Sequence, residues 1–327
     1  MSDEVLGTII LIALPASGKS EVRAYLDALD PATRETEMHI APQVVAIDDF
    51  EYVWNMRSVD EALVKGGKPR IFFQSSEKPF NDPRDWGTLI HLVNEDWWSL
   101  RTHRTFDVNN SAKILLRRLD AARLRVGAPP ALSALDPSLR LDVELGIYEQ
   151  ASRKLNQRNT RAEEGLDGKT LIIEFARGGP RGATFPLPAP LGYAHALQLL
   201  DPLILKTAVV LYVWVAPEES RRRNEERADP NNPGSTLRHS VPLDVMLGDY
   251  GCDDVEYLIG ESDKPNTIRV EKNGGVFYLP TARFDNRSDK TSFVRRPRET
   301  WTDDEIAVLH EDLKSAFETL HTVQSAQ

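Results

Sequence analysis

Residues 8–20 read T-I-I-L-I-A-L-P-A-S-G-K-S. An apolar run with strand character, Ile9–Ala13, passes through a turn of small residues into Gly-Lys-Ser at 18–20. A helix-compatible segment follows as far as Leu29. A strand, a short loop ending in Gly-Lys-Ser and a helix form the arrangement of a phosphate-binding loop. The sequence therefore predicts a bound phosphate at this turn, around which the rest of the chain is organised.

The chemistry of such a loop assigns a role to each position. In the pattern G-x-x-x-x-G-K-[ST], backbone N–H groups hold phosphate oxygens, the lysine reaches the β- and γ-phosphates and the hydroxyl binds Mg²⁺. Ala13 replaces the first glycine, which is tolerable if its φ stays below zero. A chance strand-to-helix turn is the alternative, and the flanking strand and helix argue against it. The expected nucleotide-binding residues are Pro15, Ala16, Ser17, Gly18, Lys19 and Ser20.

Length and composition narrow the class of protein. The 327 residues are enough for one large domain with an extensive core. A formal net charge of −10 argues against a general duplex-DNA or anionic-membrane binder, although a local basic cleft stays open. The single cysteine, Cys252, excludes an intrachain disulfide and a cysteine-based zinc site. This cysteine content suits a reducing cytosol, so we expect a cytoplasmic protein, and the apolar run at 9–14 is too short to span a bilayer.

Apolar strands alternate with helical patterns along most of the chain. This alternation predicts an α/β fold with a doubly wound, mostly parallel sheet. Asn273 lies in a tight turn that joins a further strand pair, and the capping box Thr302–Glu305 opens a last amphipathic helix within 299–327. The expected buried strands lie at 7–14, 43–47, 169–176 and 207–216.

Two segments interrupt this alternation. Residues 51–165 contain no comparable strand, and we interpret them as a helical insertion within a single domain of 1–327. Its helical patterns lie at about 86–101, 111–126 and 138–158. A second segment begins at Pro217, which suits the first turn of a helix, and continues through a loop to residue 240.

Asp48 and Asp49 directly follow the second expected strand. Ligands bind at the carboxyl ends of strands in such sheets. Either aspartate is a candidate to take a proton from a substrate hydroxyl, and the pair is a candidate to fix Mg²⁺ through water. The alternative is a helix N-cap with an acid that satisfies the helix dipole. The sequence ranks neither aspartate above the other.

Glu174 is the only charge in an otherwise apolar strand. A charge in that setting is expensive unless it is paired or bound to metal. We therefore expect Glu174, together with Ser20, to bind Mg²⁺ or to contact substrate. A buried pair with Arg177 is the other interpretation, and the two are compatible. Arg177 joins the candidate catalytic residues.

The helix that begins at Pro217 is rich in arginine. Arg223 and Arg227 are one turn apart and can face the same side. Guanidinium groups donate two hydrogen bonds to phosphate and would stabilise charge on a transferring phosphoryl group. We expect Arg223 and Arg227 to be catalytic and Arg221 to bind nucleotide. A solvated face is the alternative, with pairing to Glu218, Glu219, Glu225 and Glu226.

Weaker candidates lie elsewhere in the chain. Asp285 and Asn286 follow a late strand, and Asn286 is a candidate for contact with adenine or ribose. A simple turn is the alternative. The remaining residues have chemistry that suits phosphate or base contact, although structural or surface roles are commoner: Lys65, Lys68, Arg70, Arg84, Trp97, Trp98 and His239.

The stretch L-P-A-S-G-K-S resembles the phosphate loop of the nucleoside and nucleotide kinase group of P-loop proteins, in which proline commonly occupies the position of Pro15. Asp48–Tyr52 is similar to the D-D-F-Y stretch of uridine-kinase-like enzymes. The E-x-x-R element at 174–177 and the arginine-rich segment Arg221–His239 follow in the same order. These matching segments cover well under half of the chain, and 51–165 matches none of them.

This resemblance implies a P-loop NTPase fold, with 51–165 on the substrate side and 217–240 as a lid. It implies ATP and Mg²⁺, and a small-molecule acceptor that is most often a nucleoside or nucleotide. A sugar, a peptidoglycan precursor in the manner of zeta-toxin kinases, or a hydroxylated nucleic-acid base or end are alternative acceptors. A non-catalytic nucleotide switch is a further alternative, against which the chain has no N-K-x-D guanine motif and no helicase-like repeat.

Overall fold

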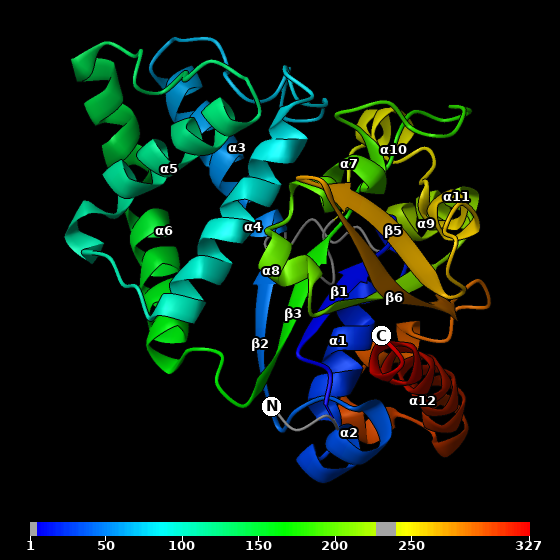
Figure 1. Cartoon of the computed structure of the whole chain (residues 1–327). Helices are drawn as coiled ribbons and strands as arrows, with labels where there is room; N and C mark the ends of the chain where they lie inside the picture. The colour runs from blue at the N-terminus through cyan, green and yellow to red at the C-terminus, as the bar shows by residue number, and fades with distance from the viewer. Residues whose placement is uncertain (1–4, 227–239) are drawn as a thin grey trace.

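The computed structural model describes residues 5–226 and 240–327 (Figure 1). Their strands form one six-stranded sheet in the order β2-β3-β1-β4-β6-β5. All neighbouring strands are parallel except β5, which pairs with β6 in antiparallel fashion. The prediction of an α/β fold with a mostly parallel sheet is therefore confirmed. The strands are β1 (Thr8–Ile12), β2 (Gln43–Asp48), β3 (Lys169–Phe175), β4 (Ala208–Trp214), β5 (Thr267–Lys272) and β6 (Gly275–Asp285).

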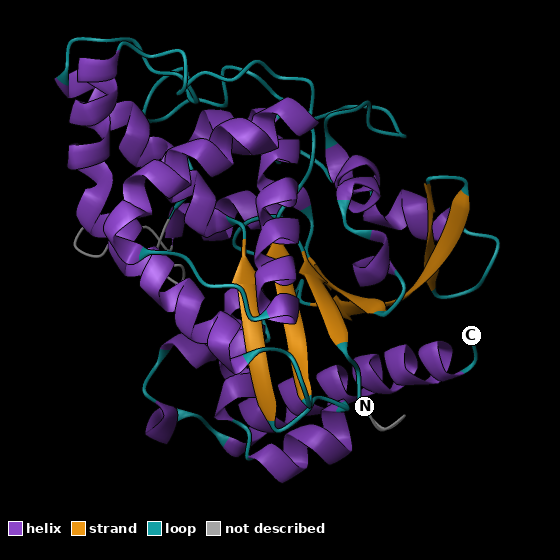
Figure 2. Ribbon diagram, turned by 60° about the vertical axis from the view of Figure 1, so that its left-hand side comes forward, coloured by secondary structure: helices purple, strands orange, loops and turns teal. Residues whose placement is uncertain are grey.

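Helices cover both faces of the sheet (Figure 2). Successive side chains of a strand point to opposite faces, so Ile10 of β1 packs into one core and Ile9 into the other. The first core is shared with α4 (Asp85–Thr102), α7 (Gly192–Leu199), α8 (Pro202–Leu205) and α11 (Val255–Gly260). The second core is shared with α1 (Lys19–Ala28), α2 (Pro31–Met38) and α12 (Asp303–Ser325). This double covering explains why the central strands are almost wholly apolar.

The segment 51–165 is helical, and its helices lie beside the β2 edge of the sheet (Figure 1). They bury a third core, which is built around Met56 and Leu116. The helices are α3 (Phe50–Lys65), α4, α5 (Ser111–Arg125) and α6 (Pro137–Glu164). The helix α3 is an addition to the patterns expected from the sequence.

The remaining elements are of the type expected from the sequence, but some of them differ from the expectation in length. The capping box of Thr302 and Glu305 is formed and opens α12 as expected. The stretch 242–259, expected as one helix, is two short ones, α10 (Leu243–Gly248) and α11. The arginine-bearing helix is α9 (Pro217–Glu226), and the loop expected beyond it lies outside the described residues.

The order of the strands determines where a ligand can bind. The chain leaves β1 for β2 on one side, returns to β3 next to β1, and then passes to β4 on the other side. The connections after β1 and β3 therefore leave the sheet in opposite directions. Such a switch point leaves a crevice at the carboxyl ends of the two strands, where open α/β sheets bind ligands.

No helix in the described part of the chain combines the length and the apolar character needed to cross a membrane.

Candidate functional site

The loop between β1 and α1 has a backbone that only particular residues can adopt. Gly18 has φ 105°, and a Cβ built on it would lie 2.6 Å from side-chain atoms of Asn286 and Thr291. Ala16 has φ 57°, in the left-handed region that is unfavourable for alanine. Ala13 is not among the residues with positive φ, so the missing first glycine costs this loop no backbone strain. The Gly-Lys-Ser end of the motif therefore requires its glycine, whereas the start does not.

Three carbonyl groups of the loop are held from outside. The Tyr193 hydroxyl donates to the Ala13 carbonyl at 2.9 Å, and the Ser220 hydroxyl donates to the Pro15 carbonyl at 2.6 Å. Asn286 Nδ2 donates to the Ser17 carbonyl at 2.7 Å. A trans peptide places the next N–H opposite its carbonyl. The N–H groups of Leu14, Ala16 and Gly18 are therefore directed away from these supports, as a phosphate-holding loop requires.

Asn286 supports the loop and does not line the pocket in front of it. Its side chain is fully buried, with Nδ2 donating to Ser17 and to Thr291 Oγ1 and with Oδ1 accepting from the Lys290 N–H. Every hydrogen-bonding atom of the amide is thus used within the protein. Its polar atoms therefore hold the loop, and the predicted contact of Asn286 with adenine or ribose stays a prediction.

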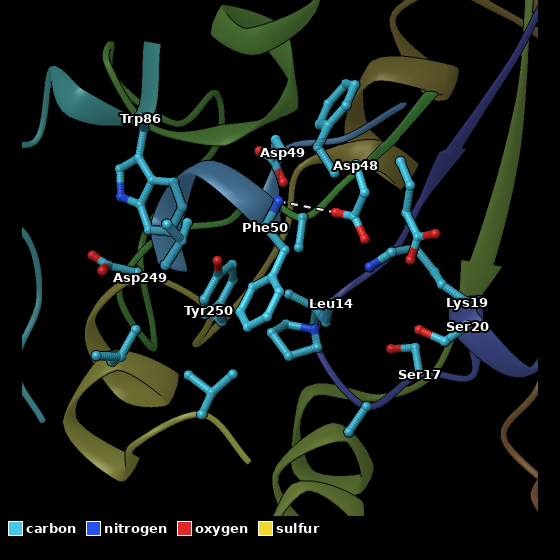
Figure 3. A pocket seen from close by; sticks show the side chains of 18 of the residues that line it. Leu14, Ser17, Lys19, Ser20, Asp48, Asp49, Phe50, Trp86, Asp249 and Tyr250 are labelled. Carbon is cyan, nitrogen blue, oxygen red and sulfur yellow. Dashed lines mark hydrogen bonds between the residues drawn. The ribbon is translucent and has the colours of Figure 1, made fainter. Parts of the chain in front are cut away.

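The pocket in front of the loop brings together residues from the ends of three neighbouring strands. Pro15, Ala16, Ser17, Gly18, Lys19 and Ser20 line one side of it. Asp48 at the end of β2 and Glu174 near the end of β3 are paired in register, and both line the same pocket. Figure 3 shows the Lys19 side chain and the Asp48 carboxylate directed toward one another, with Ser17 and Ser20 beside them.

Asp48 presents a carboxylate with an altered pKa to this pocket. Burial, together with the nearby negative charges of Glu174 and Asp49, raises the pKa of Asp48 to about 8. One oxygen, Oδ1, accepts from the Phe50 N–H at 2.9 Å, which fixes the carboxylate at the start of α3. Asp49 is the N-cap residue of α3 and makes no side-chain cap hydrogen bond, whereas Asp48 precedes the cap and lines the pocket.

Asp49 is in a different environment. It forms an ion pair of 2.7 Å with Arg177, and the two side chains are 7% and 3% exposed. Burial raises the pKa of Asp49, and the positive charge of Arg177 opposes that rise. Arg177 also donates to the Trp86 carbonyl at 3.0 Å and lies over the Trp86 ring. Both aspartates line the pocket, but they have different partners: Asp48 lies beside Glu174, and Asp49 with Arg177 ties α3 to α4.

Glu174 has a partner that the sequence did not indicate. It accepts a hydrogen bond of 2.8 Å from Arg23 of α1, and Arg177, the expected partner, is instead paired with Asp49. The pocket wall carries several hard oxygen donors, and the Ser20 hydroxyl and the carboxylates of Asp48 and Glu174 are among them. This donor set suits Mg²⁺, which usually takes one or two protein carboxylates and completes its shell with water and phosphate oxygens.

No cluster of three or more His, Cys, Asp or Glu side chains in residues 5–226 and 240–327 is arranged to hold a metal ion. A dedicated all-protein metal cage is thus not part of this region. The donor set of Ser20, Asp48 and Glu174 is of the kind that binds Mg²⁺ together with nucleotide phosphates.

The arginines of α9 are placed behind the loop. Arg223 is buried, donates to the carbonyl of Asn286 at 2.8 Å and pairs with Glu219 at 2.6 Å. In this position it holds α9 against the segment that supports the loop, and its predicted role at phosphate stays a prediction. Arg221 pairs with Glu218 at 2.7 Å and does not line the pocket, and its predicted nucleotide contact stays a prediction. Arg227 and His239 lie outside the described residues.

The weaker candidates do not line the loop pocket either. Trp97 is a core residue, and Trp98 is 42% exposed with its indole N–H donating to Asp201 at 2.9 Å. Arg84 pairs with Asp82 at 2.7 Å. The group of Lys65, Lys68 and Arg70 is likewise absent from the pocket wall.

The pocket continues from the loop into a chamber whose residues the sequence analysis did not single out. Phe50, Val53 and Arg57 reach it from α3, and Phe73, Phe80 and Trp86 reach it from the loop after α3 and from α4. The α10 region adds Val245, Asp249 and Tyr250. The spacing of 50, 53 and 57 places these side chains on one helical face, a signal that would have identified α3. The other chamber residues come from connections without periodicity.

Comparison with known proteins gives this site no further assignment. No family model matches the chain, and no match was found among the curated proteins or the solved structures.

Proposed function

We propose that this protein is an ATP-dependent phosphotransferase that moves the γ-phosphoryl group of ATP to the hydroxyl of a small molecule. The observation that carries the proposal is the pairing, across one pocket, of a Gly-Lys-Ser loop with the raised-pKa carboxylate of Asp48. A loop of this kind binds phosphate, and a carboxylate opposite it can accept the proton of an attacking hydroxyl. Neither feature alone separates a kinase from an ATPase.

The transfer step assigns a role to each residue on the pocket wall. The acceptor oxygen forms a bond to the γ-phosphorus while the bond from that phosphorus to the β,γ-bridging oxygen breaks, which releases ADP. The hydroxyl proton passes to the ionised carboxylate of Asp48. Lys19 and the loop N–H groups stabilise the charge on the phosphoryl oxygens. The Asp49–Arg177 pair holds α3 in place, so that Asp48 keeps its direction.

Magnesium would be held by the Ser20 hydroxyl and the Glu174 carboxylate, where it would neutralise charge on the β- and γ-phosphates. Glu174 is half of an ion pair with Arg23, so the arginine balances this carboxylate when no cation is near.

A nucleoside or nucleotide is the acceptor that the resemblance of the loop supports. Sugars, peptidoglycan precursors and nucleic-acid ends remain alternative acceptors within the same reaction class. A regulatory P-loop ATPase is the alternative from another class, and it would use the loop without needing a base at Asp48.

The test is ADP formation from ATP and Mg²⁺, measured with and without a panel of hydroxyl acceptors. We expect turnover that depends on an acceptor and is lost in Lys19→Ala. Turnover at one rate whatever acceptor is added would instead support the regulatory ATPase.

A further inference from the structure

The chamber beyond the phosphate loop has a mostly apolar wall. Its side chains come from three segments that are far apart in the sequence: α3, the stretch from Phe73 to Trp86, and the α10 region. Figure 3 shows Trp86 and Tyr250 across the pocket from Lys19 and Ser20, with Phe50 between the two sides. A molecule in this chamber would have its reacting end at the loop and its body among these rings.

Four of these rings form a continuous wall. The ring centroids of Phe73 and Phe80 are 4.5 Å apart, those of Phe80 and Trp86 are 4.8 Å apart, and those of Trp86 and Tyr250 are 5.5 Å apart. Each ring is less than 9% exposed, so packing fixes its orientation. Aromatic faces held in this way bind flat, apolar bodies without first having to be ordered.

The polar groups of the chamber are few, and one buried oxygen among them, Asp249 Oδ2, has no hydrogen-bond partner within the described residues. Arg57 is the cation that the described residues place on the chamber wall beyond the loop. It lies 4.4 Å from the centroid of Phe73 and donates to the Ser76 carbonyl. Asp249 is largely desolvated, and this desolvation raises its pKa to about 6. An acidic group on the ligand would therefore find Arg57 committed and Asp249 repulsive at neutral pH.

A ligand body with several polar groups would also bind poorly, because the unpartnered Asp249 Oδ2 can accept from few of them. Each buried polar group left without a hydrogen-bond partner weakens binding by about tenfold to a hundredfold. A nucleobase carries several such groups, and a nucleotide acceptor adds a charged phosphate. An apolar ring system carries no such polar groups, so it buries its surface against the ring wall without this loss of affinity.

We propose that the acceptor is a hydroxyl group carried on an uncharged, largely apolar ring system, which lies against Phe73, Phe80, Trp86 and Tyr250. This inference rests on the proposed phosphotransferase function and narrows its acceptor. It departs from the nucleoside or nucleotide that the loop resemblance supports. The hydroxyl faces Asp48, and the ring system fills the chamber.

The experiment compares acceptors of similar size that differ in polarity. ADP formation from ATP and Mg²⁺ is measured with 2-(1-naphthyl)ethanol and indole-3-ethanol as apolar alcohols. Uridine, adenosine, uridine monophosphate and glucose are the polar counterparts. We expect the apolar alcohols to give a kcat/KM at least tenfold above every polar acceptor. A higher value for any nucleoside, nucleotide or sugar overturns the inference and leaves the phosphotransferase intact.

A matched pair of variants on α3 tests the chamber itself. Val53→Asn places an amide on the wall with little change in volume, and Val64→Asn makes the same change on the same helix at a position that is 47% exposed and outside the pocket. We expect Val53→Asn to raise KM for the apolar alcohols about tenfold with unchanged affinity for ATP. Val64→Asn should behave as wild type. Equal effects of the two substitutions would overturn the inference.

A wrong acceptor inference and a wrong phosphotransferase proposal give different results in these experiments. If every acceptor leaves the rate of ADP formation unchanged, the phosphotransferase proposal is wrong and the acceptor inference falls with it. If polar acceptors alone accelerate ADP formation, the function stands and the chamber has been misassigned.

Discussion

Asp48 and Asp49 are adjacent in the chain and identical in type, yet they face different surroundings. Both line the pocket, but Asp48 ends β2 beside Glu174, whereas Asp49 is held in an ion pair with Arg177. The environment therefore decides which carboxylate can take part in chemistry. Removal of either one should damage the protein in a different way.

We expect Asp48→Asn to lower kcat/KM by about 10²–10⁴-fold, the usual contribution of a general base, while the affinity for ATP is retained. Asp49→Asn should instead destabilise the fold by about 3–5 kcal/mol, because it leaves the buried Arg177 without its partner. Steady-state kinetics and urea unfolding of both variants measure the two effects. The opposite pattern, with activity lost only in Asp49→Asn, would contradict these assignments.

The raised pKa of Asp48 predicts a pH dependence with a definite sign. The base must be ionised, so kcat/KM should rise with pH, about tenfold per unit, and level off above about 8. Glu174→Gln removes a neighbouring negative charge that helps to raise this pKa, so it should move the rise to lower pH. If kcat/KM does not change between about pH 6 and about pH 9, Asp48 is not the base.

The same group affects stability in the opposite sense. A carboxyl whose pKa is raised from 3.8 in the unfolded chain to about 8 in the folded protein contributes stability below the unfolded value. That contribution is lost as pH rises toward the folded value. The asparagine of the Asp48→Asn variant does not titrate. The Tm of this variant, relative to the Tm of wild type, should therefore rise as the pH rises through this window. Thermal unfolding of both proteins at about pH 5 and about pH 8 measures this change in the Tm difference. An equal Tm difference at both would show that Asp48 has an ordinary pKa.

At the scale of elements, the loop is held by its neighbours. Tyr193 of α7, Ser220 of α9 and Asn286 after β6 each bind one of its carbonyl groups. The sequence identifies the loop because its motif is local. It does not identify these supports, because they come from remote parts of the chain and carry no motif. Arg223 is the clearest case, since an arginine on a helix near a loop has the same sequence pattern whether it binds phosphate or a carbonyl.

Two glycines give a matched test of the loop. Gly18 and Gly67 have φ values of 105° and 70°, and only the Cβ at Gly18 would meet other atoms, whereas Gly67 faces open space. Gly67→Ala should cost about 1 kcal/mol of stability, from the left-handed backbone alone. Gly18→Ala should cost more and should abolish nucleotide binding, because Asn286 and Thr291 must move. Calorimetry and nucleotide titration compare the two, and an intact ATP affinity in Gly18→Ala would refute the close packing.

At the scale of the whole molecule, the strand order assembles the pocket. The ends of β1, β2 and β3 meet because β3 lies between the other two. The class of the sheet follows from alternating strands and helices, which the sequence displays. The chamber does not follow from any such sequence pattern, because it joins α3, α4 and the α10 region through tertiary packing alone. This is why the loop side of the pocket could be predicted from the sequence and the chamber side could not.

Binding of nucleotide at this switch point should stabilise the entire fold. At a free ATP concentration about 100-fold above Kd, the free energy of unfolding should rise by about 2.7 kcal/mol. Lys19→Ala should remove this gain, whereas the exposed Lys78→Ala should keep it. Thermal shift with ATP and Mg²⁺ measures the effect, and a gain that persists in Lys19→Ala would place the nucleotide elsewhere.

The most direct test of the central claim follows the phosphoryl group itself. ATP labelled at the γ-phosphate is incubated with the protein, Mg²⁺ and the acceptor that gives the highest turnover, and the labelled products are separated. The account predicts label on the acceptor in a one-to-one ratio with ADP, and none in Asp48→Asn or Lys19→Ala beyond background. Label that appears only as inorganic phosphate, at a rate the acceptor does not change, would contradict it.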